Sequence, residues 1–279
     1  MLCAEQDIPD HEHHQRIDWL RADPTLTTGL GGGWQASLGL PIDLRVLGIE
    51  YTTPDGEPYE PPYGDNHHRD EVLWGLTDGR AMLWRYAAPS SRLVVGGGIG
   101  TTLPFGRTEE DPFALAAEGE EHQHFQLGSG TFDPMATGQA ILAGPRWGAW
   151  LSADARVSLY ENRKGYRPPR SVAVSAGPSF RIVPDLQVLA TADGLYETPE
   201  TWDGEPYGGR AVLTTSAVAI YTVNPRLVLQ GQGRATVWQR GLGDEHDEPL
   251  TQRFVLSAGA SWSFGRGHGD QPAGVEANP

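Results

Sequence analysis

Residues Trp147–Tyr160 read WGAWLSADARVSLY and alternate between two kinds of side chain. One set is apolar and consists of Trp147, Ala149, Leu151, Ala153, Ala155, Val157 and Leu159. The intervening set is mostly polar or charged and contains Trp150, Ser152, Asp154, Arg156 and Ser158. Because adjacent side chains of a β-strand point to opposite faces, this stretch predicts a strand with one apolar and one polar face.

The same two-residue period recurs along the chain, whereas helical periodicity is scarce. It is clearest in Ser171–Ile182, Arg226–Trp238 and Arg253–Phe264. Taking Gln15–Leu30 as the first, we expect about eleven strands of roughly 13–16 residues each. Membrane-crossing strands need ~9–11 residues, while strands of soluble proteins are usually about five or six, so this length favours a membrane protein.

The predicted connections alternate between two sizes. The short ones are Gly31–Gly33, Ala88–Ser91, Gly144–Arg146, Val183–Asp185 and Asn224–Pro225, which have the composition of hairpin turns. The long polar ones are Pro54–Arg69, Gly106–Phe125, Arg163–Pro168, Pro199–Tyr207 and Arg240–Pro249. This arrangement predicts an all-β, antiparallel up-and-down transmembrane β-barrel in a bacterial outer membrane, with its short turns in the periplasm.

We expect the barrel to occupy residues 15–265, after a polar His-rich segment (1–14) and before a disordered tail (266–279). Bacterial single-chain barrels have even strand numbers, so the prediction is about twelve strands, of which roughly eleven lie in this chain. We expect one explanation for both the odd count and the lack of a visible export signal, an ascending strand and a signal peptide upstream of Met1; the alternative for the count is a strand missed or merged with its neighbour.

Composition excludes several classes of protein. The formal net charge is −15 and Lys164 is the single lysine, so we expect no nucleic-acid partner. A single cysteine, Cys3, cannot form an intrachain disulfide framework or a cysteine-based zinc site. No stretch approaches the ~18 consecutive apolar residues of a membrane helix.

Five motifs carry a resemblance to bacterial outer-membrane barrels. They are LGLPIDL (Leu38–Leu44), GDNHHRDEVLWGLTD (Gly64–Asp78), TLPFGRTEEDPFAL (Thr102–Leu115), HQHFQLGSGTFDP (His122–Pro134) and SAGASWSF (Ser257–Phe264). The last resembles the C-terminal signal read by outer-membrane assembly machinery. More narrowly, the chain resembles the transporter barrels of the meta-pathway phenol-degradation family. That resemblance implies a transport or channel role and no catalytic residues.

Histidines form three clusters that we place at the outer rim, each just before a descending strand. The metal-ligand candidates are His67, His68, His122, His124, His11 and His13. In a strand, His122 and His124 would share one face and suit Zn(II), Cu(II) or Ni(II). The alternative is a rim of histidines that make only structural hydrogen bonds.

The sequence therefore favours a non-enzymatic channel or transporter in the outer membrane for a small solute or ion, with lipid around the barrel. Two other functions stay open: a non-transporting surface barrel whose long loops bind a partner, and a soluble β-rich binding protein. The glycine-rich run GGGIG (Gly96–Gly100) lacks the lysine and the following helix of a phosphate-binding loop, and predicts close packing inside a strand instead.

Overall fold

The computed structural model describes residues 10, 12–60, 70–120, 122, 125–242 and 253–264. Its strands are β1 (Glu12–Ala22), β2 (Thr25–Gly31), β3 (Trp34–Gly39), β4 (Ile42–Thr52), β5 (Glu71–Leu76), β6 (Gly79–Ser90), β7 (Leu93–Leu103), β8 (Pro134–Ala143), β9 (Trp147–Arg156), β10 (Tyr166–Arg167), β11 (Ser171–Val183), β12 (Leu186–Glu197), β13 (Glu200–Trp202), β14 (Glu205–Tyr207), β15 (Arg210–Asn224), β16 (Leu227–Gly241) and β17 (Phe254–Trp262). The helix α1 (Pro112–Glu118) lies between β7 and β8. No helix in the described part of the chain is long and apolar enough to cross a membrane.

Three long strands are each divided in two at the same level of the sheet. β1 passes into β2 through Asp23–Pro24, β3 into β4 through Leu40–Pro41, and β5 into β6 before Gly79. Proline has no N–H to donate to a ladder, which explains the break in the first two strands. Backbone bonds from Leu40 N to Pro24 O (3.1 Å) and from Thr77 N to Pro41 O (3.0 Å) join the neighbouring strands at the level of the break. The outer halves form the sheet β1-β4-β5.

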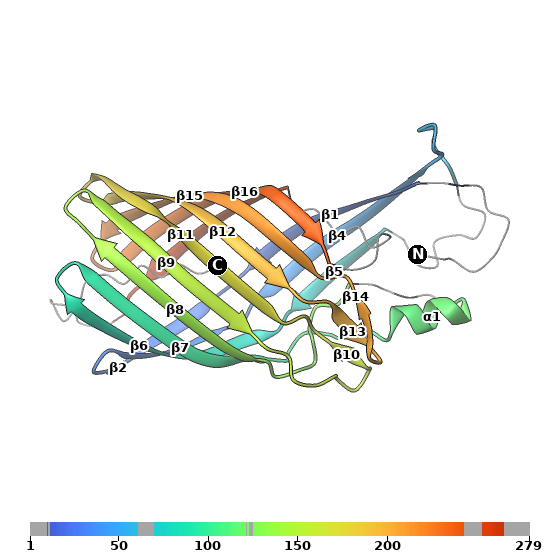
Figure 1. Ribbon diagram of the computed structural model, residues 1–279, viewed down its shortest axis with the longest axis horizontal. Helices are drawn as coiled ribbons and strands as arrows, with labels where there is room; N and C mark the ends of the chain where they lie inside the picture. Colours follow the sequence, from blue (N-terminus) through green and yellow to red (C-terminus); the bar gives the residue numbers. More distant parts are fainter. Residues whose placement is uncertain are drawn as a thin grey trace.

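The main sheet has eleven strands in the order β17-β16-β15-β12-β11-β9-β8-β7-β6-β3-β2, and every pairing in it is antiparallel. This confirms the up-and-down fold and the predicted strand count. The strands tilt and wrap into a barrel-like shape, with α1, β10, β13 and β14 together at the end that carries the long connections (Figure 1). The predicted separation of short turns from long loops is therefore correct.

The curled sheet is not closed. Its two edges are β2 and β17, and no ladder joins them among the described residues. In an antiparallel sheet of eleven strands the first and last strands run in the same direction. Direct closure would therefore need a parallel pair, whereas one additional strand could lie antiparallel to both edges.

Apolar side chains on the strands face outward and are exposed. On β15, for example, every second residue from Leu213 to Val223 is exposed. With a rise of ~3.3 Å per residue and a tilt of ~40°, this row spans about 25 Å of height. Exposed aromatic rings lie near both ends of the strands: Trp34, Trp147, Tyr221 and Trp262 towards the short turns, and Trp74, Tyr160, Tyr196, Trp238 and Phe254 towards the long loops.

The described residues contain no core of two stacked apolar layers. Seven hydrophobic side chains are buried, and they are Leu47, Leu73, Met82, Leu127, Tyr166, Leu189 and Trp202. Leu47, Leu73 and Leu127 form one small cluster, against which Ile17 and Phe125 pack. An exposed apolar surface of this extent is unusual for a soluble monomer.

Two predicted boundaries are wrong. β1 begins at Glu12, three residues before the predicted start of the barrel, so His13 and His14 belong to the strand. The long connection predicted to end at Phe125 continues through residues 126–133, which are irregular, and the next strand, β8, begins at Pro134. The reason is that the side chains of Ser129, Thr131 and Asp133 bond one another, and Ser129 Oγ accepts from the backbone N–H of Thr131, instead of alternating on a sheet. The predicted tail, residues 266–279, lies outside the described residues.

Candidate functional site

The inner face of β9, β11, β12, β15 and β16 is lined mainly by hydroxyl, amide and charged side chains. Asp193 on β12 is the centre of this wall. Its carboxylate accepts hydrogen bonds from the hydroxyls of Ser175, Thr191 (3.0 Å), Thr214 (3.4 Å) and Ser216 (2.6 Å). The polar side of the sequence pattern in Trp147–Tyr160 therefore faces the interior, as predicted.

Large side chains of β6 lie against glycines of β7 on the opposite part of the inner wall. Trp84 and Tyr86 are stacked, with ring centroids 5.9 Å apart. A Cβ atom built on Gly96 would lie 2.5 Å from the Tyr86 ring, and one built on Gly98 would lie 2.9 Å from the Trp84 ring. The run GGGIG thus serves close packing, which confirms the interpretation drawn from the sequence. Tyr86 Oη also accepts a hydrogen bond from Gln139 Nε2 (2.8 Å).

The long connection between β7 and β8 folds back against the inner face of the wall. Leu127 of this segment packs against Leu47 of β4 and Leu73 of β5. Next to it, Arg45 Nη1 donates to the backbone oxygen of Gln126 (3.1 Å). We call residues 104–133 the inward segment. Its helix α1 lies at the end of the sheet that carries the long loops (Figure 1).

A buried carboxylate holds two arginines beside this contact. Asp43 is 1 % exposed, and its two oxygens accept from Arg21 Nε (2.7 Å) and Arg45 Nη2 (2.7 Å). Both guanidinium groups also lie over the ring of Trp19, at 4.9 and 4.5 Å from its centroid. The two guanidinium groups and the carboxylate form a clamp beside the point where the inward segment is attached.

Asp78 ties the inward segment to the break between β5 and β6. Its carboxylate accepts from the backbone N–H of Gly106 (3.3 Å) and from both the N–H (2.6 Å) and the hydroxyl (2.5 Å) of Ser129. Gly106 and Gly128 approach closely there, because a Cβ on Gly106 would lie 2.5 Å from the Cα of Gly128. The lack of a side chain on Gly106 and on Gly128 is what allows the two backbones to approach this closely.

Asp133 closes the inward segment with a fully buried carboxylate in the loop before β8. Oδ1 accepts from Thr131 Oγ1 (2.9 Å), whereas Oδ2 has no hydrogen-bond partner among the described residues. Burial raises the pKa of Asp133, and the bond from Thr131 and the nearby charge of Arg156 only partly oppose that shift. Asp43, Asp78 and Asp133 were not predicted from the sequence as site residues. Asp43 did carry a signal, because it is an acidic residue at an inward-facing position of an alternating strand.

The outer loops hold the inward segment from the other side. Asn162 Nδ2 donates to Ser129 O (2.9 Å), and Lys164 Nζ donates to Thr108 O (2.9 Å). The ring of Phe113 on α1 stacks on Tyr207 of β14, with centroids 3.6 Å apart. The segment therefore spans the mouth from the β4–β5 wall to the loops that follow β9 and β12. Within these loops, burial raises the pKa of Tyr166 well above its usual value, and its hydroxyl donates to Glu200 (2.9 Å).

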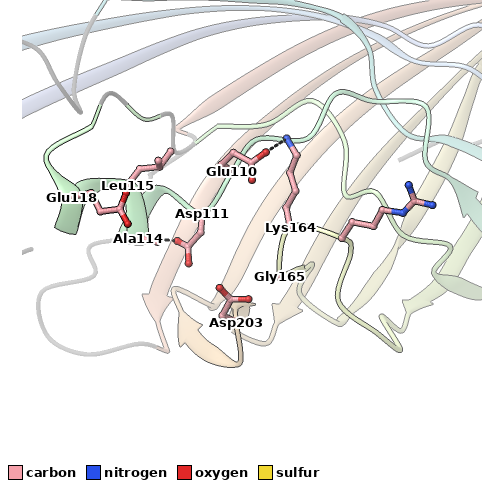
Figure 2. Close-up of a pocket in the computed structure, with 9 residues that line it drawn as sticks. Glu110, Asp111, Ala114, Leu115, Glu118, Lys164, Gly165 and Asp203 are labelled. Carbon is pink, nitrogen blue, oxygen red and sulfur yellow. Dashed lines mark hydrogen bonds and ion pairs between the residues drawn. The ribbon is translucent and has the colours of Figure 1, made fainter.

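An acidic hollow of about 360 Å³ lies at this mouth, between α1 and the turns at Lys164 and Asp203 (Figure 2). Its charged lining consists of the carboxylates of Glu110, Asp111, Glu118 and Asp203 and of the cations Arg163 and Lys164. Lys164 is paired with Glu110 (2.9 Å), and Asp111 caps α1 by accepting from Phe113 N (2.8 Å). The remaining charge is negative, so the hollow favours cations over anions.

Most predicted metal ligands cannot be placed. His67, His68, His124 and His11 lie outside the described residues, and the side chain of His13 does as well. His122 is buried in an irregular stretch, and its Nδ1 lies 3.0 Å from Glu120 O. Because His124 lies outside the described residues, the shared face predicted for His122 and His124 stays a prediction. No group of three or more potential metal-ligating side chains occurs within the described residues. Metal binding stays a prediction.

Comparison with known proteins gives one informative likeness. The fold is similar to that of the COG4313 outer membrane channel from Pseudomonas putida F1, known from a crystal structure. The two share 11% sequence identity over 90% of this chain and 85% of that one, with a TM-score of 0.56. No family model matches the chain, and no curated protein matches it. The likeness supports the barrel-like fold, whereas the narrower resemblance to the phenol-degradation family is not confirmed.

Proposed function

We propose that this protein is an outer-membrane β-barrel that passes small polar solutes or cations through its interior, with the inward segment as the constriction. The observation that carries the proposal is the division of the sheet into two faces. An exposed apolar surface with aromatic rings near both ends suits lipid, and a polar inner wall suits a hydrated path. The fold likeness to an outer membrane channel supports the same conclusion.

The inward segment controls the path in this proposal. It crosses the mouth. Leu47, Leu73, Arg45 and Asp78 hold it on one side, and Asn162 and Lys164 hold it on the other. The acidic hollow beside α1 places negative charge at the entrance (Figure 2). We therefore expect cations and neutral solutes to pass more readily than anions of equal size.

Conductance in planar lipid bilayers tests the function. The purified chain should insert, and the reversal potential in a salt gradient should indicate a preference for cations. The Asp78→Asn variant removes the charge that holds Gly106 and Ser129, so its single-channel conductance should rise. Asp18→Asn is the matched control, because Asp18 is exposed on β1 and, among the described residues, is paired only with Arg16 (3.0 Å).

The alternatives make different predictions in the same preparations. A non-transporting surface barrel would resist carbonate extraction and show heat-modifiable mobility, yet it would carry no current in any variant. A soluble binding protein would be released by carbonate. Equal conductance of the wild type and Asp78→Asn would contradict the role given to the inward segment.

A further inference from the structure

A small positively charged pocket lies among the outer loops, apart from the interior. It has a volume of about 270 Å³ and is lined by Arg167, Arg170, Ser158, Thr198, Thr201, Pro168, Pro199 and Pro206. Two arginines and no carboxylate line it, in a chain whose net charge is −15. Such a local excess of positive charge needs a partner.

Neither guanidinium group is neutralised within the described residues. Arg170 Nε donates to the backbone oxygen of Ser158 (3.3 Å), and no ion pair engages its terminal nitrogens. The half-buried Arg167 side chain has no hydrogen bond or ion pair with the described part of the chain. The hydroxyls are already used: Ser158 donates to Pro168 O (2.5 Å), and Thr201 donates to Glu161 (3.3 Å). The donors left for a ligand are thus the arginine N–H groups, which suit an oxyanion.

The pocket lies directly above the outward apolar face. Arg170 continues the outward row of Val172 and Val174 on β11, and all three are exposed. On β12 the outward Tyr196 is followed two residues later by Thr198, whose hydroxyl accepts from Arg170 N (3.0 Å). Two residues of a tilted strand add about 5 Å of height. The arginines therefore stand at the level where lipid tails end and headgroups begin, next to an aromatic side chain of the kind found at that interface.

We infer that this pocket binds a phosphate monoester of a glycolipid in the outer leaflet, with Arg167 and Arg170 as its ligands. The inference rests on the proposed outer-membrane function, because it takes the apolar face to be in lipid. A phosphate accepts several N–H groups at once, which would neutralise two like charges that otherwise repel each other. The acyl chains would then extend along the exposed valines of β11.

Native mass spectrometry of the full chain in detergent tests the inference with three probes: bisphosphorylated lipid A, the same lipid A without phosphates, and inorganic phosphate. The wild type should retain the phosphorylated lipid at least about tenfold more tightly than the dephosphorylated one, given the strength of charge-assisted bonds. Arg167→Gln/Arg170→Gln should lose that preference. Arg181→Gln, which changes an exposed arginine at the opposite end of β11, should keep it.

The outcomes separate the lipid inference from the channel proposal. An unchanged preference in the double variant overturns the site. Binding of inorganic phosphate as tight as that of the phosphorylated lipid overturns the lipid assignment in favour of a free anion. Each preparation is also tested for bilayer conductance. Conductance without any phosphate preference rejects the pocket alone, whereas failure to insert into bilayers rejects the function on which it rests.

Discussion

At the scale of single residues, Asp43 is the side chain on which most of the interior depends. Its 1 % exposure means that its charge has no water to compensate it, so Arg21 and Arg45 must do so. Arg45 also anchors Gln126 of the inward segment. Removal of one partner from a buried ion pair leaves the others uncompensated and typically costs about 3–5 kcal/mol.

Asp43→Asn should therefore lower the free energy of unfolding by about 3 kcal/mol, the lower end of that range because Arg21 remains partly solvated. Urea unfolding in lipid vesicles, followed by tryptophan fluorescence, measures the loss. The exposed pair of Arg16 and Asp18 gives the comparison, and Asp18→Asn should cost less than about 1 kcal/mol. Equal losses in the two variants would contradict a special role for Asp43.

Asp133 makes the free energy of unfolding depend on pH. Burial raises the pKa of this loop carboxyl in the folded state, so folding favours its protonated form. Its contribution to stability is therefore complete below the unfolded pKa of about 3.9, and it is lost as the pH rises through the raised folded pKa. The difference in unfolding free energy between wild type and Asp133→Asn should decrease over that window, by about 1.4 kcal/mol per unit of pKa shift. A difference that grows with pH would mean that Arg156 outweighs burial.

The histidine clusters are tested by zinc binding. If the rim holds Zn(II), the double variant His122→Ala/His124→Ala should bind it at least about tenfold more weakly than the wild type, because a site rarely survives the loss of two ligands. Isothermal titration of the purified barrel measures the affinity. His246→Ala, which changes a histidine outside all three clusters, serves as the control. Equal affinity in all three proteins would remove these residues from consideration.

At the scale of elements, the pairing of β6 with β7 shows how a glycine-rich strand makes room for large side chains of the neighbouring strand. Gly96 and Gly98 leave room for Tyr86 and Trp84 to lie flat on the wall instead of filling the interior.

Gly96→Ala should push the Tyr86 ring inward and disturb its bond to Gln139, at a cost of about 1–3 kcal/mol in stability and with reduced conductance. Gly231→Ala on β16 is the control, because a Cβ there would meet no atom within 4 Å. Comparable effects of both substitutions would contradict the packing argument.

At the scale of the whole molecule, the open edge between β2 and β17 decides how the barrel closes. Because the two edges run in the same direction, we expect them not to pair with each other directly.

In a Cys3→Ser background, Thr27→Cys on β2 with Ser257→Cys on β17 should form no disulfide under oxidation, since an intervening strand would hold them about 10 Å apart. Gln232→Cys with Ser257→Cys, which are direct partners on β16 and β17, should cross-link. Efficient cross-linking of the first pair would indicate a closed eleven-stranded barrel.

The sequence by itself determined the wall of this protein. The alternation in Trp147–Tyr160, and the change from short turns to long loops, predict the strands, their antiparallel order and the face that each side chain occupies. These features are local, because a two-residue period needs no information from distant parts of the chain. The Asp43 clamp and the lining of the Arg167–Arg170 pocket required the tertiary structure. Asp43 meets Arg21 of another strand, and Arg45, which also binds Asp43, meets Gln126 of a loop far away in sequence; such contacts leave no periodic signal. The predicted end of the long connection at Phe125 was too early for the same reason, since Ser129 is drawn to Asp78, 51 residues away.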